Sequence, residues 1–198
     1  MNLIPEICIQ TKDSVLATYS FEHNKELIDN CVREITGKLL VKPQIKLFGK
    51  ICHQRRNVAF FSDESIGYYY SNQLMRSQKM SPYLTKLLEI INENFDSNYN
   101  GILVNQYING NDYIGKHSDD ESGLANNNTG VVAISVGTPR KFRIRDKITN
   151  KIVMDIPTKS YHILHMGGKF QEEFTHEIPI EKKITTGRIS FTFRHHIQ

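Results

Sequence analysis

The stretch NQYINGNDYIGKHSDDE, residues 105–121, contains side chains whose types and spacing suit metal chemistry. Within it, His117 and Asp119 are separated by a single residue. Side chains two positions apart in an extended segment point to the same side, so both residues can reach one ion. The same pattern also occurs by chance, and a solvated polar loop is the alternative interpretation.

A third candidate ligand, His176, lies far downstream in FTHEIPI, next to an apolar strand-like run. Two histidines and one carboxylate form the facial set that leaves open positions on iron(II) for a co-substrate and oxygen. Zinc accepts the same donors, so the donor set alone does not choose the metal. His165 in HILHM is the nearest competing histidine, and we interpret it as a core or edge-strand residue.

The run GRISFTFRHH indicates an anion site. Arg188 and Arg194 are six positions apart in this strand-like run and therefore share one face, whereas Phe191 and Phe193 face the other way. Burying two guanidinium groups is costly unless they meet an anion. A dicarboxylate suits them because guanidinium binds carboxylate in a bidentate manner. The alternative is a basic outer face on an edge strand.

The segments around these groups predict the elements that position them. Apolar residues at helical spacing predict a helix over residues 22–35. Residues 44–53, QIKLFGKICH, alternate like a strand with a turn at Gly49. Ser81 as an N-cap and Pro82 at the first helical position predict a second helix.

After Gly101 the sequence becomes a series of short β-prone runs, separated by Gly, Asn, Asp and Pro, which is typical of an antiparallel sandwich or barrel. We therefore predict an α+β protein with a mainly β core. Residues 1–100 would form an N-terminal helical extension and residues 101–198 the barrel, integrated in one domain.

Composition sets broad limits. With 198 residues, of which 39% are hydrophobic, the chain can bury a core. A net charge of +4 permits a polyanionic partner without demanding one. The three cysteines are scattered, which favours a reducing compartment over a disulfide framework. No signal peptide or membrane span is evident, so we expect a soluble intracellular monomer, nuclear or cytoplasmic.

Together these motifs resemble a known family. H-x-D, a distant His and R-x5-R resemble the iron(II)/2-oxoglutarate dioxygenases. Within that group, residues 105–121 resemble the N-x-Y…H-x-D-D-E segment of the AlkB nucleic-acid demethylases, and RISFTFR resembles their R-x-N-x-T-F-R. The similarity spans residues 47–194 and is greatest to the animal-type members that repair duplex DNA. It implies a double-stranded β-helix, a jelly-roll or cupin-like barrel, with a nucleotide-recognition lid.

The resemblance assigns the site residues. Iron(II) would be held by His117, Asp119 and His176. The co-substrate 2-oxoglutarate would be bound by Asn105, Tyr107, Arg188, Ser190 and Arg194, with Arg188 and Tyr107 on its distal carboxylate. Ser190 stands where the family often has Asn, but a serine can still donate a hydrogen bond. Phe174 stands where an indole or imidazole often lies.

The resemblance also implies substrate contacts. Phe48, at the tip of a hairpin, would fill the gap left by a flipped base. Arg56 would contact the DNA, while Tyr68 and Tyr70 would stack on the base. The remaining predicted substrate contacts are Asp120 and Glu121 with the cationic base, and Lys182 and Lys183 with phosphates. A second basic stretch, RKFRIR at residues 140–145, would have one face solvated or bound to the nucleic-acid backbone.

The implied activity is oxidative demethylation of 1-methyladenine and 3-methylcytosine in DNA, with iron(II), 2-oxoglutarate and O2. The N-methyl group is hydroxylated and lost as formaldehyde. Three alternatives share parts of these motifs: an RNA demethylase with the same site, a nucleic-acid-binding protein with a degenerate site, and a protein hydroxylase built on the same barrel. Ordinary core packing or loop solvation is the alternative role for each substrate-facing residue.

Overall fold

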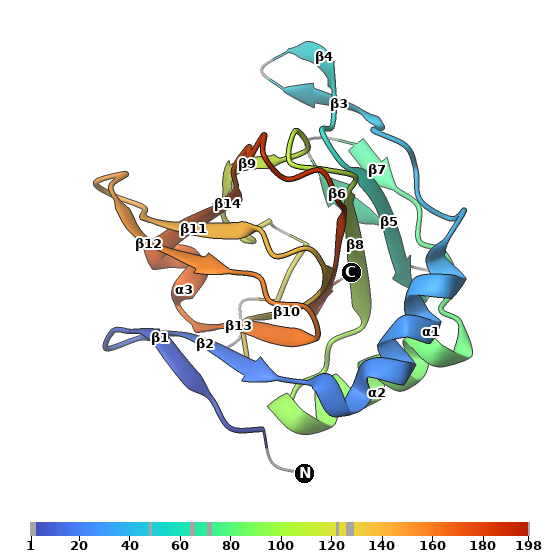
Figure 1. Cartoon of the computed structure of the whole chain (residues 1–198), viewed down its shortest axis with the longest axis horizontal. Helices are drawn as coiled ribbons and strands as arrows, with labels where there is room; N and C mark the ends of the chain where they lie inside the picture. Colours follow the sequence, from blue (N-terminus) through green and yellow to red (C-terminus); the bar gives the residue numbers. More distant parts are fainter. Residues whose placement is uncertain are drawn as a thin grey trace.

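The computed structural model describes residues 3–47, 49–63, 66–70, 73–121, 123–125 and 129–197, and for residues 47, 68–70, 73 and 74 it describes the backbone alone. It consists of two facing antiparallel sheets with helices on one side (Figure 1). Among the described residues, no helix has the length and apolar character needed to cross a membrane.

The larger sheet contains β1 (Glu6–Gln10), β2 (Ser14–Ser20), β5 (Asn57–Ser62), β8 (Gly101–Tyr107), β10 (Val131–Gly137), β13 (His162–Gly168) and β15 (Arg188–Arg194). Their order is β1-β2-β13-β10-β15-β8-β5. The smaller sheet contains β9 (Ile114–His117), β11 (Lys141–Asp146), β12 (Ile152–Pro157) and β14 (Phe174–Ile178), in the order β12-β11-β14-β9. From β8 to β15 the chain crosses from one sheet to the other after every strand except β11, which is followed by β12 in the same sheet. Such crossing is typical of a jelly roll.

Two helices cover the outer face of the larger sheet: α1 (Lys25–Ile35), preceded by the 3-10 turn η1 (Glu22–Asn24), and α2 (Pro82–Phe95). Ser81 caps α2, because its hydroxyl oxygen accepts a hydrogen bond from the Leu84 amide. The apolar faces of both helices pack on the outward-facing residues of the sheet, including Phe191 and Phe193 of β15. This core explains why β15 has an apolar outer face and leaves its inner face for polar groups.

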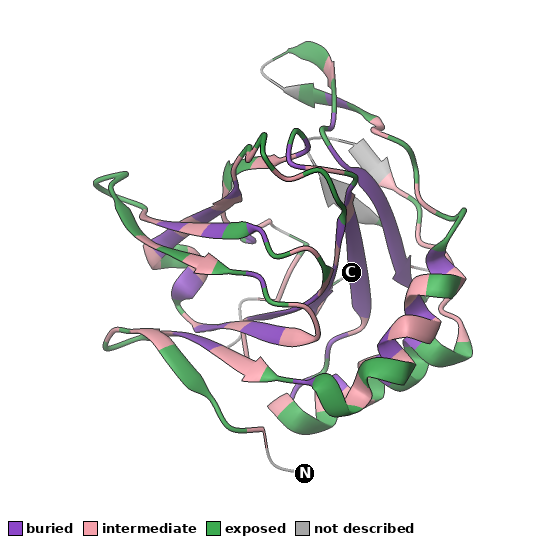
Figure 2. Cartoon of the chain, in the orientation of Figure 1, coloured by how far each residue is buried: buried purple, intermediate pink, exposed green. Residues whose placement is uncertain are grey.

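A second core lies between the sheets, where Phe142, Ile144 and Phe174 of the smaller sheet face Leu164 and Met166 of the larger one. Figure 2 shows the buried residues along both sheets. A short helix, α3 (Phe170–Glu173), leads into β14. The hairpin of β3 (Gln44–Leu47) and β4 (Lys50–His53) projects from the body, and β6 (Tyr68–Tyr70) pairs with β7 (Gln73–Met75) beside β5 (Figure 1).

The structure confirms both predicted helices, the turn near Gly49 and the antiparallel β core. It differs in the first hundred residues, which the sequence analysis assigned to a helical extension. This half contributes β1, β2 and β5 to the same sheet as the strands after Gly101. The difference arises because β2 completes the sheet by pairing with β13 along its length, from His162–Ser20 to Gly168–Ser14.

Candidate metal and co-substrate site

His117, Asp119 and His176 come together between the two sheets, with one ligand atom from each residue lying within 4.8 Å of the others. His117 ends β9 and His176 lies on β14, and the two are direct partners in the antiparallel register. The Nε2 atoms of His117 and His176 lie 3.7 and 3.8 Å from the two carboxylate oxygens of Asp119. The H-x-D pattern is therefore part of a three-residue site and not a solvated loop.

Burial keeps both histidines neutral. It lowers the pKa of His176 to about 3, with the neighbouring His117 adding to the effect, and it also lowers the pKa of His117. Burial alone would raise the pKa of Asp119, but Arg194, His176 and His117 together outweigh burial and hold that pKa below its usual value. Two neutral imidazoles and one ionised carboxylate are the protonation states a divalent metal requires.

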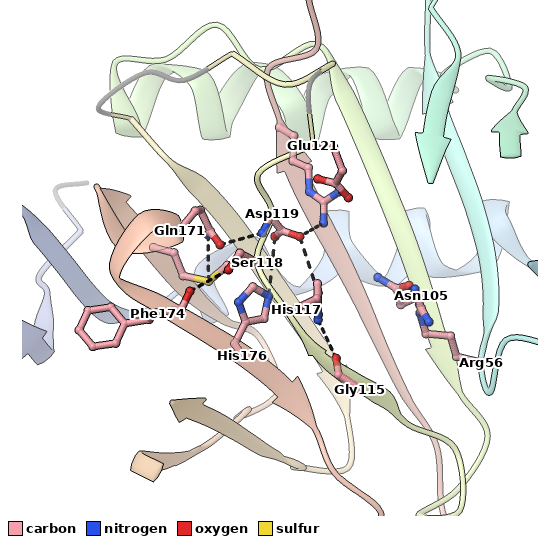
Figure 3. A network of polar contacts seen from close by, with 12 residues as sticks. Arg56, Asn105, Gly115, His117, Ser118, Asp119, Glu121, Gln171, Phe174 and His176 are labelled. Carbon is pink, nitrogen blue, oxygen red and sulfur yellow. Dashed lines mark hydrogen bonds and ion pairs between the residues drawn. The ribbon is translucent and has the colours of Figure 1, made fainter. Parts of the chain in front are cut away.

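Neighbouring groups hold His117 and Asp119 in place (Figure 3). The Nδ1 atom of His117 lies 2.8 Å from the Gly115 carbonyl oxygen, which leaves Nε2 for a metal. Arg194 donates from Nη2 to the Asp119 carboxylate at 2.5 Å. Gln171 of α3 accepts a hydrogen bond of 2.9 Å from the Asp119 amide. The donor set, its protonation and its fixed geometry fit iron(II).

The triad opens into a cavity of about 590 Å³, a volume that includes its open mouth. All five residues that the resemblance assigns to 2-oxoglutarate line it: Asn105, Tyr107, Arg188, Ser190 and Arg194. They meet because of strand register, since β15 pairs with β8 and places Arg188 opposite Tyr107 and Ser190 opposite Asn105. The two arginines therefore share the inner face, as their spacing predicted.

Arg188 is buried, and burial lowers its pKa to about 10. Its Nη2 donates to the Ser135 hydroxyl at 2.9 Å, and its guanidinium lies 5.4 Å from the centre of the Tyr107 ring. No carboxylate among the described residues forms an ion pair with it, and its Nε has no hydrogen-bond acceptor there. A buried cation in this state fits the distal carboxylate of 2-oxoglutarate.

Two predicted residues have roles beyond those expected. Arg194 pairs with the carboxylate of Asp119, so it supports the metal ligand as well as lining the cavity. Arg56, expected to contact DNA, is buried at 4% exposure and donates from Nε to the Asn105 side chain at 2.6 Å. Its guanidinium therefore lies within the cavity, and contact with a substrate there stays a prediction.

The other predicted substrate residues are spread around the site. Asp120 forms an ion pair of 2.8 Å with Lys147, and Glu121 lies 4.0 Å from Arg194. Lys182 and Lys183 are exposed on the loop between β14 and β15. Phe48 lies outside the described residues, as do the side chains of Tyr68 and Tyr70. Their assignments stay predictions.

The second basic stretch differs from expectation. Arg143 pairs with Asp155 at 2.8 Å and Arg145 with Glu177 at 2.9 Å, so neighbouring strands already neutralise both charges. Arg140 is 1% exposed, with its Nε 3.0 Å from the Glu181 carboxylate. The alternation of basic residues with Phe142 and Ile144 suggested a solvated basic face. Arg140, however, precedes β11, and its side chain points into the protein interior.

A site of two histidines and one aspartate inside an antiparallel jelly roll, beside a buried arginine, defines the class of metal-dependent oxygenases that use a 2-oxo acid. Comparison with known proteins agrees. Residues 16–194 match the model of the 2OG-Fe(II) oxygenase superfamily, so the chain belongs to that family. The family uses iron(II), 2-oxoglutarate and O2, and the site described above fits the metal and the co-substrate.

Similar proteins place the chain among the AlkB-type members. The chain is 27% identical over 170 residues to human DNA oxidative demethylase ALKBH2, an alignment that covers 82% of this chain and 64% of the relative. It is 30% identical over 150 residues to human alpha-ketoglutarate-dependent dioxygenase alkB homolog 3, covering 71% and 51%. The chain thus spans about half to two thirds of these relatives.

A solved structure titled "The structure of OsALKBH1" superposes with a TM-score of 0.62 at 15% identity, covering 96% of this chain and 100% of that one. At this identity the likeness shows the fold alone. It agrees with the jelly roll described above.

The sequence predicted the residues that the structure brings together around the cavity, but not Gln171 or the buried position of Arg140. Gln171 lies five positions before His176 in a polar run, KFQEEF, where a solvated helix was an equally good interpretation. Its role depends on a hydrogen bond to the backbone of Asp119. A pattern of side chains in the sequence does not predict a hydrogen bond to a backbone amide. The signal for Arg140 was Glu181, the acidic residue in an otherwise basic loop.

Proposed function

We propose that this chain is an iron(II)- and 2-oxoglutarate-dependent dioxygenase that oxidatively demethylates 1-methyladenine and 3-methylcytosine in DNA. The observation that carries the proposal is that two neutral histidines and an ionised aspartate line the same cavity as the buried Arg188. The relatives named DNA oxidative demethylases support the choice of a methylated base in DNA as the substrate.

The chain's own residues would bind and orient the reactants. His117, Asp119 and His176 would hold iron, while Arg188 and Tyr107 would receive the distal carboxylate of 2-oxoglutarate. With O2, the bound iron and co-substrate supply the oxidation that hydroxylates an N-methyl group, which then leaves as formaldehyde. Arg194 keeps Asp119 ionised and fixed.

Electrostatics and shape support a nucleic-acid substrate. 1-Methyladenine and 3-methylcytosine are cationic, and the partly buried Glu121 lies close to the metal ligands. The exposed Lys182 and Lys183 offer cations for phosphates. The projecting hairpin of β3 and β4 is held at its base by an ion pair of 2.7 Å between Lys42 and Asp112. Such a hairpin suits contact with a duplex, whose base must be flipped to reach iron.

The test is formaldehyde release from a duplex oligonucleotide carrying one 1-methyladenine, with iron(II), 2-oxoglutarate and ascorbate. The His117→Ala variant is the control. We expect turnover by the wild-type protein and none by the variant. Absence of turnover on duplex DNA, single-stranded DNA and RNA, with iron and 2-oxoglutarate shown to be bound, would contradict the proposal.

A further inference from the structure

Arg140 is a fully buried charged side chain near Tyr107, which lines the co-substrate cavity. Its guanidinium donates to three backbone carbonyl oxygens: that of Asn109 at 3.1 Å, that of Asp112 at 3.0 Å and that of Pro179 at 2.7 Å. Its Nε donates to the Glu181 carboxylate at 3.0 Å. One side chain therefore ties the turn between β8 and β9 to the start of the loop between β14 and β15.

The backbones of this turn and this loop also meet directly. The Gly110 amide donates to the Ile184 carbonyl and the Glu181 amide to the Gly110 carbonyl, both at 2.8 Å. A Cβ atom at Gly110 would lie 1.9 Å from the Glu181 carbonyl oxygen, so glycine is required for this approach. Arg140 binds the same junction from inside the protein, where its donors satisfy backbone carbonyl oxygens of both segments.

Two arginine side chains lie close to the ring of Tyr107. The Arg140 guanidinium is 5.7 Å from the ring centre, and the Arg188 guanidinium is 5.4 Å from it. Tyr107 is the last residue of β8, directly before the turn that Arg140 holds. The Arg140 guanidinium therefore contacts Tyr107 and also holds the turn that follows it.

We propose that Arg140 is a positioning residue of the co-substrate pocket, which holds Tyr107 against Arg188 so that both meet the distal carboxylate of the 2-oxo acid. The inference rests on the proposed function in one respect, the binding of 2-oxoglutarate by Arg188 and Tyr107. Arg140 itself would touch no substrate. Its fork of donors is essential, because a lysine has the charge but cannot reach several acceptors in one plane.

The test compares two ligands on protein loaded with manganese(II), which occupies the metal site without turnover. Titration calorimetry gives the affinities for 2-oxoglutarate and for 2-oxopentanoate, which has the same chain length and lacks the distal carboxylate. For Arg140→Lys we expect the ratio of the two affinities to fall about tenfold, the size typical of residues that orient a binding group. The control is Arg143→Lys, which changes a partly exposed arginine on β11, the strand that directly follows Arg140. This variant should leave the ratio of the two affinities unchanged.

The outcomes separate the inference from the proposed function. A ratio equal to that of the wild-type protein, or an equal loss for both ligands, would overturn the positioning role. If Arg140→Lys does not fold, Glu181→Ala decides, because it frees one end of the guanidinium and should lower the ratio by a smaller factor. Wild-type protein that fails to prefer 2-oxoglutarate would instead refute the proposed co-substrate site.

Discussion

Arg188 is a buried cation that lowers the stability of the fold and suits an anionic ligand. Its pKa, lowered by burial to about 10, shows that the fold disfavours the charged form relative to water. The guanidinium is still charged at neutral pH, because this pKa lies well above 7. A carboxylate ligand would offset the cost of burying the charge. Without that ligand, the side chain is an uncompensated charge in the interior.

We therefore predict opposite effects of Arg188→Met on stability and binding. Without ligand, the variant should be more stable than the wild-type protein by about 1 kcal/mol, because an apolar chain of similar length replaces a buried cation. Affinity for 2-oxoglutarate should fall at least about tenfold. Thermal unfolding and titration calorimetry measure the two effects. A variant that is destabilised by several kcal/mol would show that Arg188 is a structural residue.

Gln171 offers a second residue-scale prediction. It accepts a hydrogen bond from the amide of Asp119, so it fixes the backbone that carries a metal ligand. Gln171→Leu keeps the size and removes the acceptor, and should lower manganese(II) affinity about 10–100-fold, as for other partners of metal ligands. Gln171→Glu keeps the acceptor and should retain affinity. Equal losses in both variants would show that packing, and not the hydrogen bond, is responsible.

For single residues, the sequence predicts a shared site when the spacing of the residues places their side chains on the same face of a strand. The interval between His117 and Asp119, and that between Arg188 and Arg194, follow from strand geometry, and the structure places all four in one site. Residues that bind backbone groups show no characteristic spacing in the sequence. Arg140 binds three carbonyls from connections distant in sequence, so only the folded chain shows its place.

Among the elements, the loop between β14 and β15 combines a buried anchor with exposed charge. Glu181 faces inward to Arg140, while Lys182 and Lys183 are exposed. The loop is thus held at one end while its lysines remain available to phosphates. This arrangement explains why an acidic residue occurs within a basic loop.

We predict that Lys182→Ala/Lys183→Ala weakens DNA binding mainly through its salt dependence. Each phosphate contact contributes about 0.9 to the slope of log affinity against log salt for duplex DNA, so the slope should shrink by about 1.8. Fluorescence anisotropy over a salt series measures it. Lys38→Ala/Lys86→Ala removes two exposed lysines elsewhere and is the charge-matched control. Equal changes in both double variants would indicate a general effect of net charge.

Element prediction succeeded where periodicity was strong and failed where pairing decided the structure. Helix α2 combines a capping serine, a proline at its first position and an apolar face, so its first residue could be predicted from the sequence. Strand β9 is only four residues long and contains Gly115 and Lys116. These residues form a strand because they pair with β14, and not because of their own β propensity. Likewise β2 is defined by β13.

For the whole molecule, the buried histidines link stability to pH. Burial lowers the pKa of His176 to about 3 and that of His196 to about 4, and the pKa values of His117 and His165 are lowered as well. An unfolded histidine has a pKa of about 6.5. Below that pH the unfolded chain therefore binds more protons than the folded one, and folding stability falls as pH falls.

We predict that the metal-free protein loses stability progressively from about pH 6.5 to pH 4, by roughly 1–2 kcal/mol at pH 5 for each of His176 and His196. Manganese(II) should protect part of this stability, because it competes with protons at His117 and His176 but not at His196. Thermal unfolding across this pH range, with and without the metal, separates the two contributions. A melting temperature that stays constant down to pH 4.5 in the metal-free protein would mean that these imidazoles are protonated in the folded state. The triad would then present no lone pairs to a metal at that pH, and the metal-loaded and metal-free curves would coincide.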